Sequence, residues 1–260
     1  MDVRLNGKTA LITGGSLGMG RAMALRFGAS GAEVAIVARR PEVLEEAKAE
    51  IAKAGAPRVE SYPCDVADGA AVKAMFAKVT EDFGKVDILV NNAGSSQTAA
   101  FEEITDEVWQ ADLELKLFSA IRLCRLAFPG MKERKWGRII NVLNSYAKAP
   151  RAGGAPTAVS RAAGMALTKV LAGEGAPHNV LVNALCTGLI VSDQWRRRYQ
   201  REGAQGSFEE FLGNMGKEIP LGRVGEAEEF ANIACFLASD ASSYITGTAI
   251  NVDGNLSPVV

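Results

Sequence analysis

A run of glycines follows the first apolar segment of the chain, in a pattern that could bind phosphate. Residues 8–20 read KTALITGGSLGMG, so a short strand leads into a turn and then into a helix. Gly14 permits the sharp turn, Gly18 lets the backbone approach a pyrophosphate, and Gly20 lets the helix pack against the strand. Free N–H groups at a helix N-terminus favour an anion. We therefore expect a dinucleotide to bind at Gly14, Ser16, Leu17, Gly18, Met19 and Gly20.

The composition limits the class of protein to which this chain can belong. Its 260 residues are within reach of one α/β domain, and 48% of them are hydrophobic, which is ample for a core. A formal net charge of −1 gives no reason to expect nucleic acid or a membrane surface as a partner. No apolar run approaches the ~18 residues of a membrane span. With four separated cysteines, no signal-peptide pattern and a single histidine, we expect a cytoplasmic protein without a metal site.

Apolar runs alternate with helical runs along the whole chain. Pro41 is placed to begin one helix and Asp68 to cap another, and two long helical regions are expected at 105–135 and 157–175. Such alternation predicts an α/β, single-domain Rossmann fold over residues 1–260, with a doubly wound parallel sheet of about seven strands. The strands are expected at 11–13, 33–38, 58–62, 87–90, 138–142, 181–185 and 249–252.

Residues 189–218 interrupt this alternation. They carry three consecutive arginines and several aromatic residues in place of another strand and helix. Ligands bind beyond the carboxyl ends of the strands in such folds. We therefore expect this segment to form a helical lid over a substrate.

Four motifs together resemble the short-chain dehydrogenase/reductase family over nearly the full length of the chain. Residues 13–20 match its TGxxxGxG pattern, residues 91–94 match its NNAG pattern, and residues 137–141 match its fifth-strand approach to the active site. Asp65 matches the aspartate that contacts the adenine ring in that family. The resemblance implies that Asp65, Val66, Asn92, Ala93 and Gly94 bind the cofactor.

The catalytic positions of that family hold different residues here. Its Tyr-x-x-x-Lys register reads Thr157 and Arg161, its serine position thirteen residues earlier reads Asn144, and its asparagine position reads Lys116. The family's tyrosine exchanges a proton with the substrate oxygen. A threonine hydroxyl cannot ionise at useful pH, and an arginine keeps its charge but cannot act as a base.

Other residues could take over part of the chemistry. Lys116 could place an ammonium in the site, Tyr146 could supply a phenol, and Arg161 could bind the nicotinamide ribose. Tyr146 could equally pack against the lid. We therefore name Lys116, Asn144, Tyr146, Thr157 and Arg161 as candidate catalytic residues.

Two further segments bear on the cofactor. NAD-binding members end the second strand with an acidic residue, whereas Ala38 stands here, followed by Arg39 and Arg40. A guanidinium favours a 2′-phosphate, so we expect NADP(H) over NAD(H), with Arg39 as its ligand; the two arginines could also be exposed loop charges. Residues 183–192 resemble the family's N-x-x-x-P-G-x-[IV]-x-T, which adds Thr187, Ile190 and Ser192 as cofactor residues.

These observations favour an NADP(H)-dependent oxidoreductase that acts on a small carbonyl or alcohol. Two alternatives stay open: a weakly active or silent dinucleotide-binding protein, such as a sensor or partner subunit, and non-redox chemistry on the same scaffold. The resemblance also implies a homotetramer or homodimer that pairs through the helices at 101–134 and 157–175.

Overall fold

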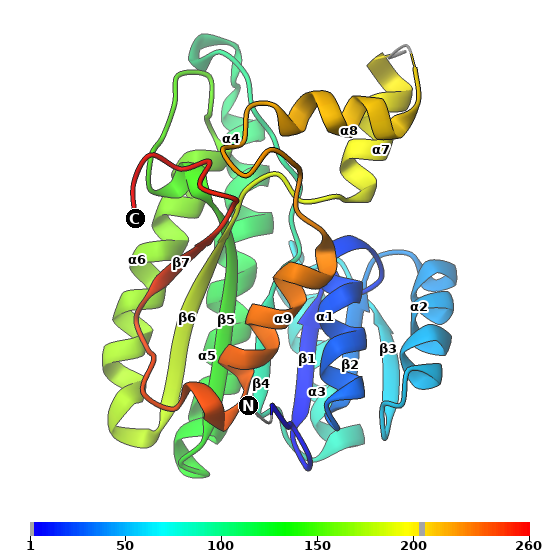
Figure 1. The fold of residues 1–260 in the computed structure, drawn as a ribbon. Coiled ribbons are helices and arrows are strands. Elements are labelled where there is room, and N and C mark those ends of the chain that lie inside the picture. The colour runs from blue at the N-terminus through cyan, green and yellow to red at the C-terminus, as the bar shows by residue number, and fades with distance from the viewer. Residues whose placement is uncertain (1–2, 203–205) are drawn as a thin grey trace.

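Seven parallel strands form one sheet at the centre of the molecule (Figure 1). The computed structural model describes residues 3–202 and 206–260. The strand order is β3-β2-β1-β4-β5-β6-β7, and every neighbouring pair is parallel. The expected Rossmann fold is thereby confirmed, with strand ends that differ from the predictions by up to two residues. The strands are β1 (Thr9–Thr13), β2 (Glu33–Ala38), β3 (Val59–Pro63), β4 (Ile88–Asn91), β5 (Gly137–Asn144), β6 (Val180–Thr187) and β7 (Ala249–Val252).

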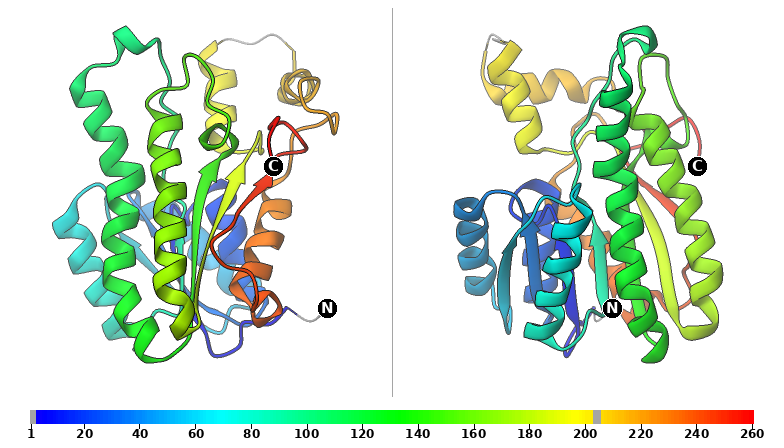
Figure 2. Two further views of the ribbon diagram at one scale, coloured as in Figure 1. Left: turned by 90° about the vertical axis from the view of Figure 1, so that its left-hand side faces the viewer. Right: turned by 180° about the vertical axis from the view of Figure 1, so that it is seen from behind.

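Helices cover both faces of the sheet (Figures 1 and 2). One face carries α1 (Gly18–Ala29), α2 (Pro41–Lys53) and α9 (Ala227–Ala238), and the other carries α3 (Gly69–Phe83), α5 (Ser119–Glu133) and α6 (Thr157–Gly175). Pro41 begins α2, and the Asp68 side chain caps α3 by accepting from the N–H groups of Ala70 and Ala71, as expected.

The long helical region expected at 105–135 is not one regular helix. The structure divides it into α4 (Asp106–Leu113), a π-helical turn at Glu114–Phe118, and α5. A π turn inserts an extra residue into a helix and is frequent at functional sites. Here the turn contains Lys116, whose side chain is buried.

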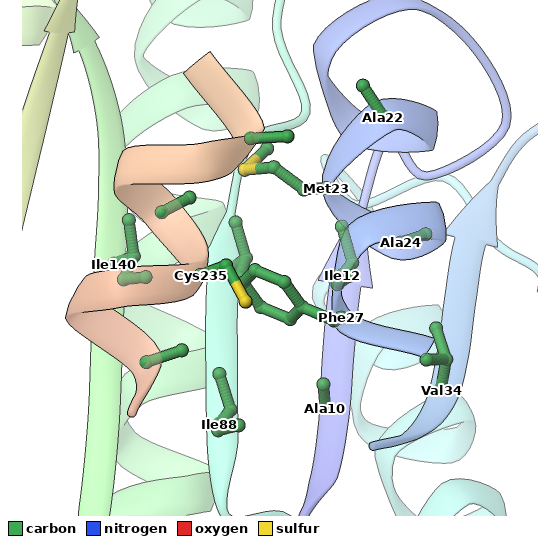
Figure 3. Packing of buried hydrophobic residues seen from close by; sticks show 14 of the residues in the cluster. Ala10, Ile12, Ala22, Met23, Ala24, Phe27, Val34, Ile88, Ile140 and Cys235 are labelled. Atoms are coloured by element: carbon green, nitrogen blue, oxygen red, sulfur yellow. The ribbon is translucent and has the colours of Figure 1, made fainter. Parts of the chain in front are cut away.

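The larger part of the core lies between the sheet and the α1–α9 layer (Figure 3). Phe27 of α1 and Phe230 of α9 are fully buried, together with Met23 and Ile12. Burying a side chain of this size contributes about 1.5–3 kcal/mol. This packing fixes α1, and with it the glycine turn at the start of α1.

Two short helices, α7 (Asp193–Glu202) and α8 (Phe208–Gly216), lie beyond the carboxyl ends of the strands (Figure 1). The ring of Tyr199 packs against Phe208 and Phe211, with centroids 5.6 and 5.7 Å away. Ser207 and Glu210 form a capping box that begins α8. The two helices lie where the lid was expected at 189–218, of which residues 203–205 lie outside the described part. Within the described ranges, none of the helices has the length and apolar character that a membrane span requires.

Candidate active site

The glycine turn between β1 and α1 has the conformation that an open phosphate site requires. Gly14 and Gly18 have positive φ angles of 65° and 52°, which side chains rarely adopt. A Cβ atom on Gly20 would collide with the carbonyl oxygen of Gly14, so the helix can approach the strand only with glycine there. Among the described residues, no side chain caps the first turn of α1, whose N–H groups are therefore available to a ligand.

Hydrogen bonds join the loop after β4 to Thr13, the residue just before this turn. Thr13 Oγ1 accepts from the N–H groups of Asn92 and Ala93 at 2.9 and 3.0 Å, and it donates to the carbonyl of Val90 at 3.2 Å. Asn92 Nδ2 returns a bond of 2.9 Å to the Thr13 carbonyl. These bonds hold the two loops of the site in one arrangement.

A cavity of about 620 Å³ opens above this turn. It runs from the glycine turn, residues 14–20, which we call the phosphate loop, to the end of β2. Arg39 and Arg40 line it there, and Cys64 lies at the same end. Volumes of this order are typical of cofactor sites. The predicted cofactor residues that line it are Gly14, Ser16, Leu17, Gly18, Met19, Gly20, Arg39, Asp65, Val66, Asn92, Ala93, Gly94 and Ser192.

Three predicted cofactor residues do not line this cavity. Arg161 donates from Nη1 to the Val142 carbonyl at 2.8 Å, and its second terminal nitrogen, Nη2, lies beside Gly94. Thr187 lies beside the glycine turn, with Oγ1 3.6 Å from the sulfur of Met19. Ile190 is buried in the core cluster.

A buried polar cluster lies where the candidate catalytic residues gather. The Lys116 ammonium forms an ion pair with Asp112, and it donates to Thr157 Oγ1 at 2.6 Å. Ser160 Oγ donates to the second oxygen of Asp112 at 2.7 Å. The side chains of Lys116 and Asp112 are only 1% and 2% exposed. The cluster therefore joins the π turn to the first turn of α6 without contact with solvent.

The hydroxyl of Thr157 has no remaining hydrogen-bonding capacity. It donates to the carbonyl of Gln97 at 2.7 Å and accepts from the N–H of the same residue at 2.9 Å, in addition to the bond from Lys116. A hydroxyl has one proton and two lone pairs, and all three are used. Segment 97–99 also pairs with residues 155–156, so it covers Thr157.

Burial lowers the pKa values of both cations in this region. Burial lowers the pKa of Lys116 to about 8, although Asp112 opposes the shift, and the nearby charge of Arg161 adds to it. Burial likewise lowers the pKa of Arg161 to about 10, again against the effect of Asp112.

The two remaining candidates lie at the end of β5. Asn144 is its last residue, and its Oδ1 atom is buried without a partner among the described residues. Tyr146 lies in the following 3-10 turn, Ser145–Ala147, with its ring 5.5 Å from the Arg151 guanidinium. Neither residue bonds to the Lys116–Asp112 pair in the described part.

The chain matches known proteins over nearly its whole length. A family model described as enoyl-(acyl carrier protein) reductase matches residues 14–257. D-beta-hydroxybutyrate dehydrogenase of Cupriavidus necator is 37% identical, covering 96% of this chain and 98% of the relative. The chain belongs to the short-chain dehydrogenase/reductase family.

Further relatives agree with this assignment. The 3-oxoacyl-[acyl-carrier-protein] reductase of Thermotoga maritima is 34% identical, covering 98% of this chain and 99% of the relative. The solved L-sorbose reductase of Gluconobacter frateurii, complexed with NADPH and L-sorbose, has a TM-score of 0.96 at 35% identity, with both chains covered in full. The expected family and the expected oxidoreductase class are therefore confirmed.

Three residues of this site were not predicted from the sequence. Asp112 and Ser160 complete the buried cluster, and Gln97 binds Thr157 through its main chain. The four-residue spacing of Asp112 and Lys116 within one helix was a usable signal for their ion pair. The main-chain bonds of Gln97 left no trace in the sequence.

Proposed function

We propose that this protein is an NADP(H)-dependent oxidoreductase that moves a hydride to or from a small carbonyl or alcohol substrate. The observation that carries the proposal is the open cavity, in which the glycine turn at one side and Arg39 at the other suit a phosphorylated dinucleotide. The related L-sorbose reductase was solved with NADPH, which supports the same cofactor class. The cofactor supplies the hydride, and the chain holds and orients it.

The preference for NADP(H) rests on the end of β2. Ala38 places no carboxylate against a 2′-phosphate, and Arg39 and Arg40 both line the cavity there. A charge-assisted hydrogen bond contributes about 1.5–3 kcal/mol. Calorimetry should therefore show NADPH binding at least about tenfold more tightly than NADH, with the difference lost in Arg39→Ala. Equal affinities in the wild-type protein would contradict the preference.

We also propose that the proton transfer does not use the family's tyrosine and lysine positions. Thr157 is only 4% exposed, and its hydroxyl already forms three hydrogen bonds. Lys116 is committed to Asp112 and Thr157 in the same buried cluster. Arg161, which packs against Gly94 beside the cavity, is suited to hold the nicotinamide ribose by hydrogen bonds and not to move a proton.

Among the candidates, Tyr146 carries the chemistry of a proton donor. It lies just beyond the carboxyl end of β5, where substrates bind in such folds, and two residues after Asn144, whose buried Oδ1 atom has no partner among the described residues. General acid catalysis contributes about 10²–10⁴-fold. Tyr146→Phe should lower turnover by that factor with little change in NADPH affinity.

A carbonyl panel tests the activity itself. NADPH oxidation would be followed with short keto acids, hydroxyketones, sugars and 3-oxoacyl thioesters, beside a direct titration of NADPH. The proposal expects turnover of at least one class. Tight NADPH binding without turnover of any class would contradict it and favour a silent dinucleotide-binding protein.

We further propose that the protein forms a homotetramer or homodimer through α5 and α6. These helices lie side by side on one face (Figure 2), and Val159 and Val170 of α6 are 50% and 58% exposed. Apolar side chains on such a face suit an isologous contact. Light scattering at micromolar concentration should give a multiple of 27.5 kDa, whereas a monomer would contradict the proposal.

A further inference from the structure

Helix α7 presents two different faces to its surroundings. Asp193, Gln194 and Arg197, which share one side of the helix, line the cofactor cavity. On another side, Tyr199 packs on α8, and the Arg196 guanidinium lies 4.7 Å from the ring of Phe208. The packing on α8 therefore holds α7 with its 193/194/197 face turned toward the cavity.

Two neighbouring segments lie close to the beginning of α7 at this cavity. The N–H of Ser96 donates to Gln194 Oε1 at 3.5 Å, which joins α7 to the loop after β4. Ser192, just before the helix, lies 3.6 Å from where a Cβ atom on Gly18 would stand. Figure 1 shows the resulting arrangement, with α7 above the amino-terminal end of α1. Arg197, about one turn beyond Gln194, lines the same cavity as the glycine turn.

The cationic side chains of the cavity fall into two groups. Arg39 and Arg40 follow β2, and Asp65 and Val66 follow the neighbouring β3, whereas Arg197 comes from α7 and Ser192 lies just before that helix. Asp193, the first residue of α7, also lines the cavity. Arg197 itself is exposed, in contrast to the buried Lys116.

We propose that Arg197 is a further cofactor-binding residue, which closes over the phosphate loop and binds the pyrophosphate of the dinucleotide from the lid side. This inference rests on the proposed dinucleotide binding. The glycine turn binds the pyrophosphate from below through main-chain N–H groups, and the Arg197 guanidinium supplies a charged partner from above. The pyrophosphate is common to NADP(H) and NAD(H), whereas the 2′-phosphate is not. Arg197 therefore strengthens binding of both cofactors, in contrast to Arg39.

The test compares three single arginine variants in titrations with NADPH and with NADH. Arg197→Ala should weaken both cofactors by about tenfold, the effect of one charge-assisted hydrogen bond. Arg39→Ala should weaken NADPH alone. Arg201→Ala is the matched control, because it removes the same charge one turn further along α7, from an exposed residue outside the cavity lining, and it should change neither affinity.

The outcomes separate this inference from the proposed function. If wild-type protein binds neither cofactor, the proposed function fails first. If both cofactors bind but Arg197→Ala behaves like Arg201→Ala, the role of Arg197 is refuted. If Arg197→Ala weakens NADPH but not NADH, Arg197 contacts the 2′-phosphate, and the pyrophosphate assignment is wrong. Equal melting temperatures of the variants would show that the exposed substitutions leave the fold intact.

Discussion

The two ends of the cleft use their polar groups in opposite ways. At the dinucleotide end, the first-turn N–H groups of α1 have no side-chain cap, and the arginines at the end of β2 line an open cavity. At the other end, Lys116, Asp112, Thr157 and Ser160 bond to one another and are closed off from solvent. Polar groups that are already paired hold a structure together, whereas unpaired groups in an open cavity can bind a ligand. We infer that one set of polar groups is available to a ligand and that another set stabilises the fold.

The largest expected effect comes from breaking the buried ion pair. Lys116→Met leaves the Asp112 carboxylate buried without its cation, which should lower the free energy of unfolding by about 3–5 kcal/mol. Lys116→Met combined with Asp112→Leu removes both charges and should recover most of that loss, since the Ser160 hydroxyl, no longer bonded to Asp112, can donate to the Thr157 carbonyl 3.1 Å away. Urea unfolding of the two variants provides the measurement. A loss below about 1 kcal/mol in the single variant would show that the cluster is not closed.

At the open end, Gly20→Ala should remove NADPH binding and lower the free energy of unfolding by about 1–3 kcal/mol. The added Cβ would collide with the Gly14 carbonyl and displace the phosphate loop. Gly213→Ala in α8 is the matched control, because a Cβ there meets nothing within 4 Å. The control should gain about 0.5–1 kcal/mol from helix propensity and keep its NADPH affinity. Calorimetry measures the NADPH affinity of both variants. Normal affinity in Gly20→Ala would refute the proposed phosphate site at the glycine turn.

The closed end should also show a pH dependence of stability that comes from Lys116. The pKa of Lys116 is about 8 in the fold, because of burial, and 10.5 in the unfolded chain. Between these values the unfolded chain binds more protons, so stability must rise with pH, by at most about 1.4 kcal/mol per unit. The variant with both Lys116→Met and Asp112→Leu should lack this rise. Parallel profiles of wild type and variant between pH 8 and 10 would contradict the burial of a shifted lysine.

The sequence predicted the fold and the open end of the site better than the closed end. Alternating apolar and helical runs are local signals, so the sheet, Pro41 and Asp68 could be placed before the structure was known. The glycines of the phosphate loop could be interpreted in the same way, because their φ angles and the close approach at Gly20 exclude side chains. Lys116 was also named as a candidate from the sequence, although its burial with Asp112 was not predicted.

The closed end depends on contacts between distant segments, and periodicity does not show these. Gln97 and Thr157 are 60 residues apart, and the Thr157 hydroxyl bonds to main-chain atoms of Gln97, which every residue type except proline would offer. The π turn within the 105–135 region was not expected either, and it holds Lys116, which bonds to Thr157. In the lid, the sequence showed three consecutive arginines but not which of them lines the cavity.

The most direct test of this contrast is the turnover of Thr157→Val with NADPH and a carbonyl substrate, measured beside its NADPH affinity, with Thr157→Ser as the control that keeps the hydroxyl. If the Thr157 hydroxyl serves only the buried cluster, Thr157→Val should keep its NADPH affinity and a kcat within about tenfold of wild type, while its free energy of unfolding falls by about 1–3 kcal/mol. A loss of kcat of about 100-fold or more in Thr157→Val alone, with the fold and the NADPH affinity intact, would show that Thr157 transfers the proton. That result would contradict the structural role assigned to it here.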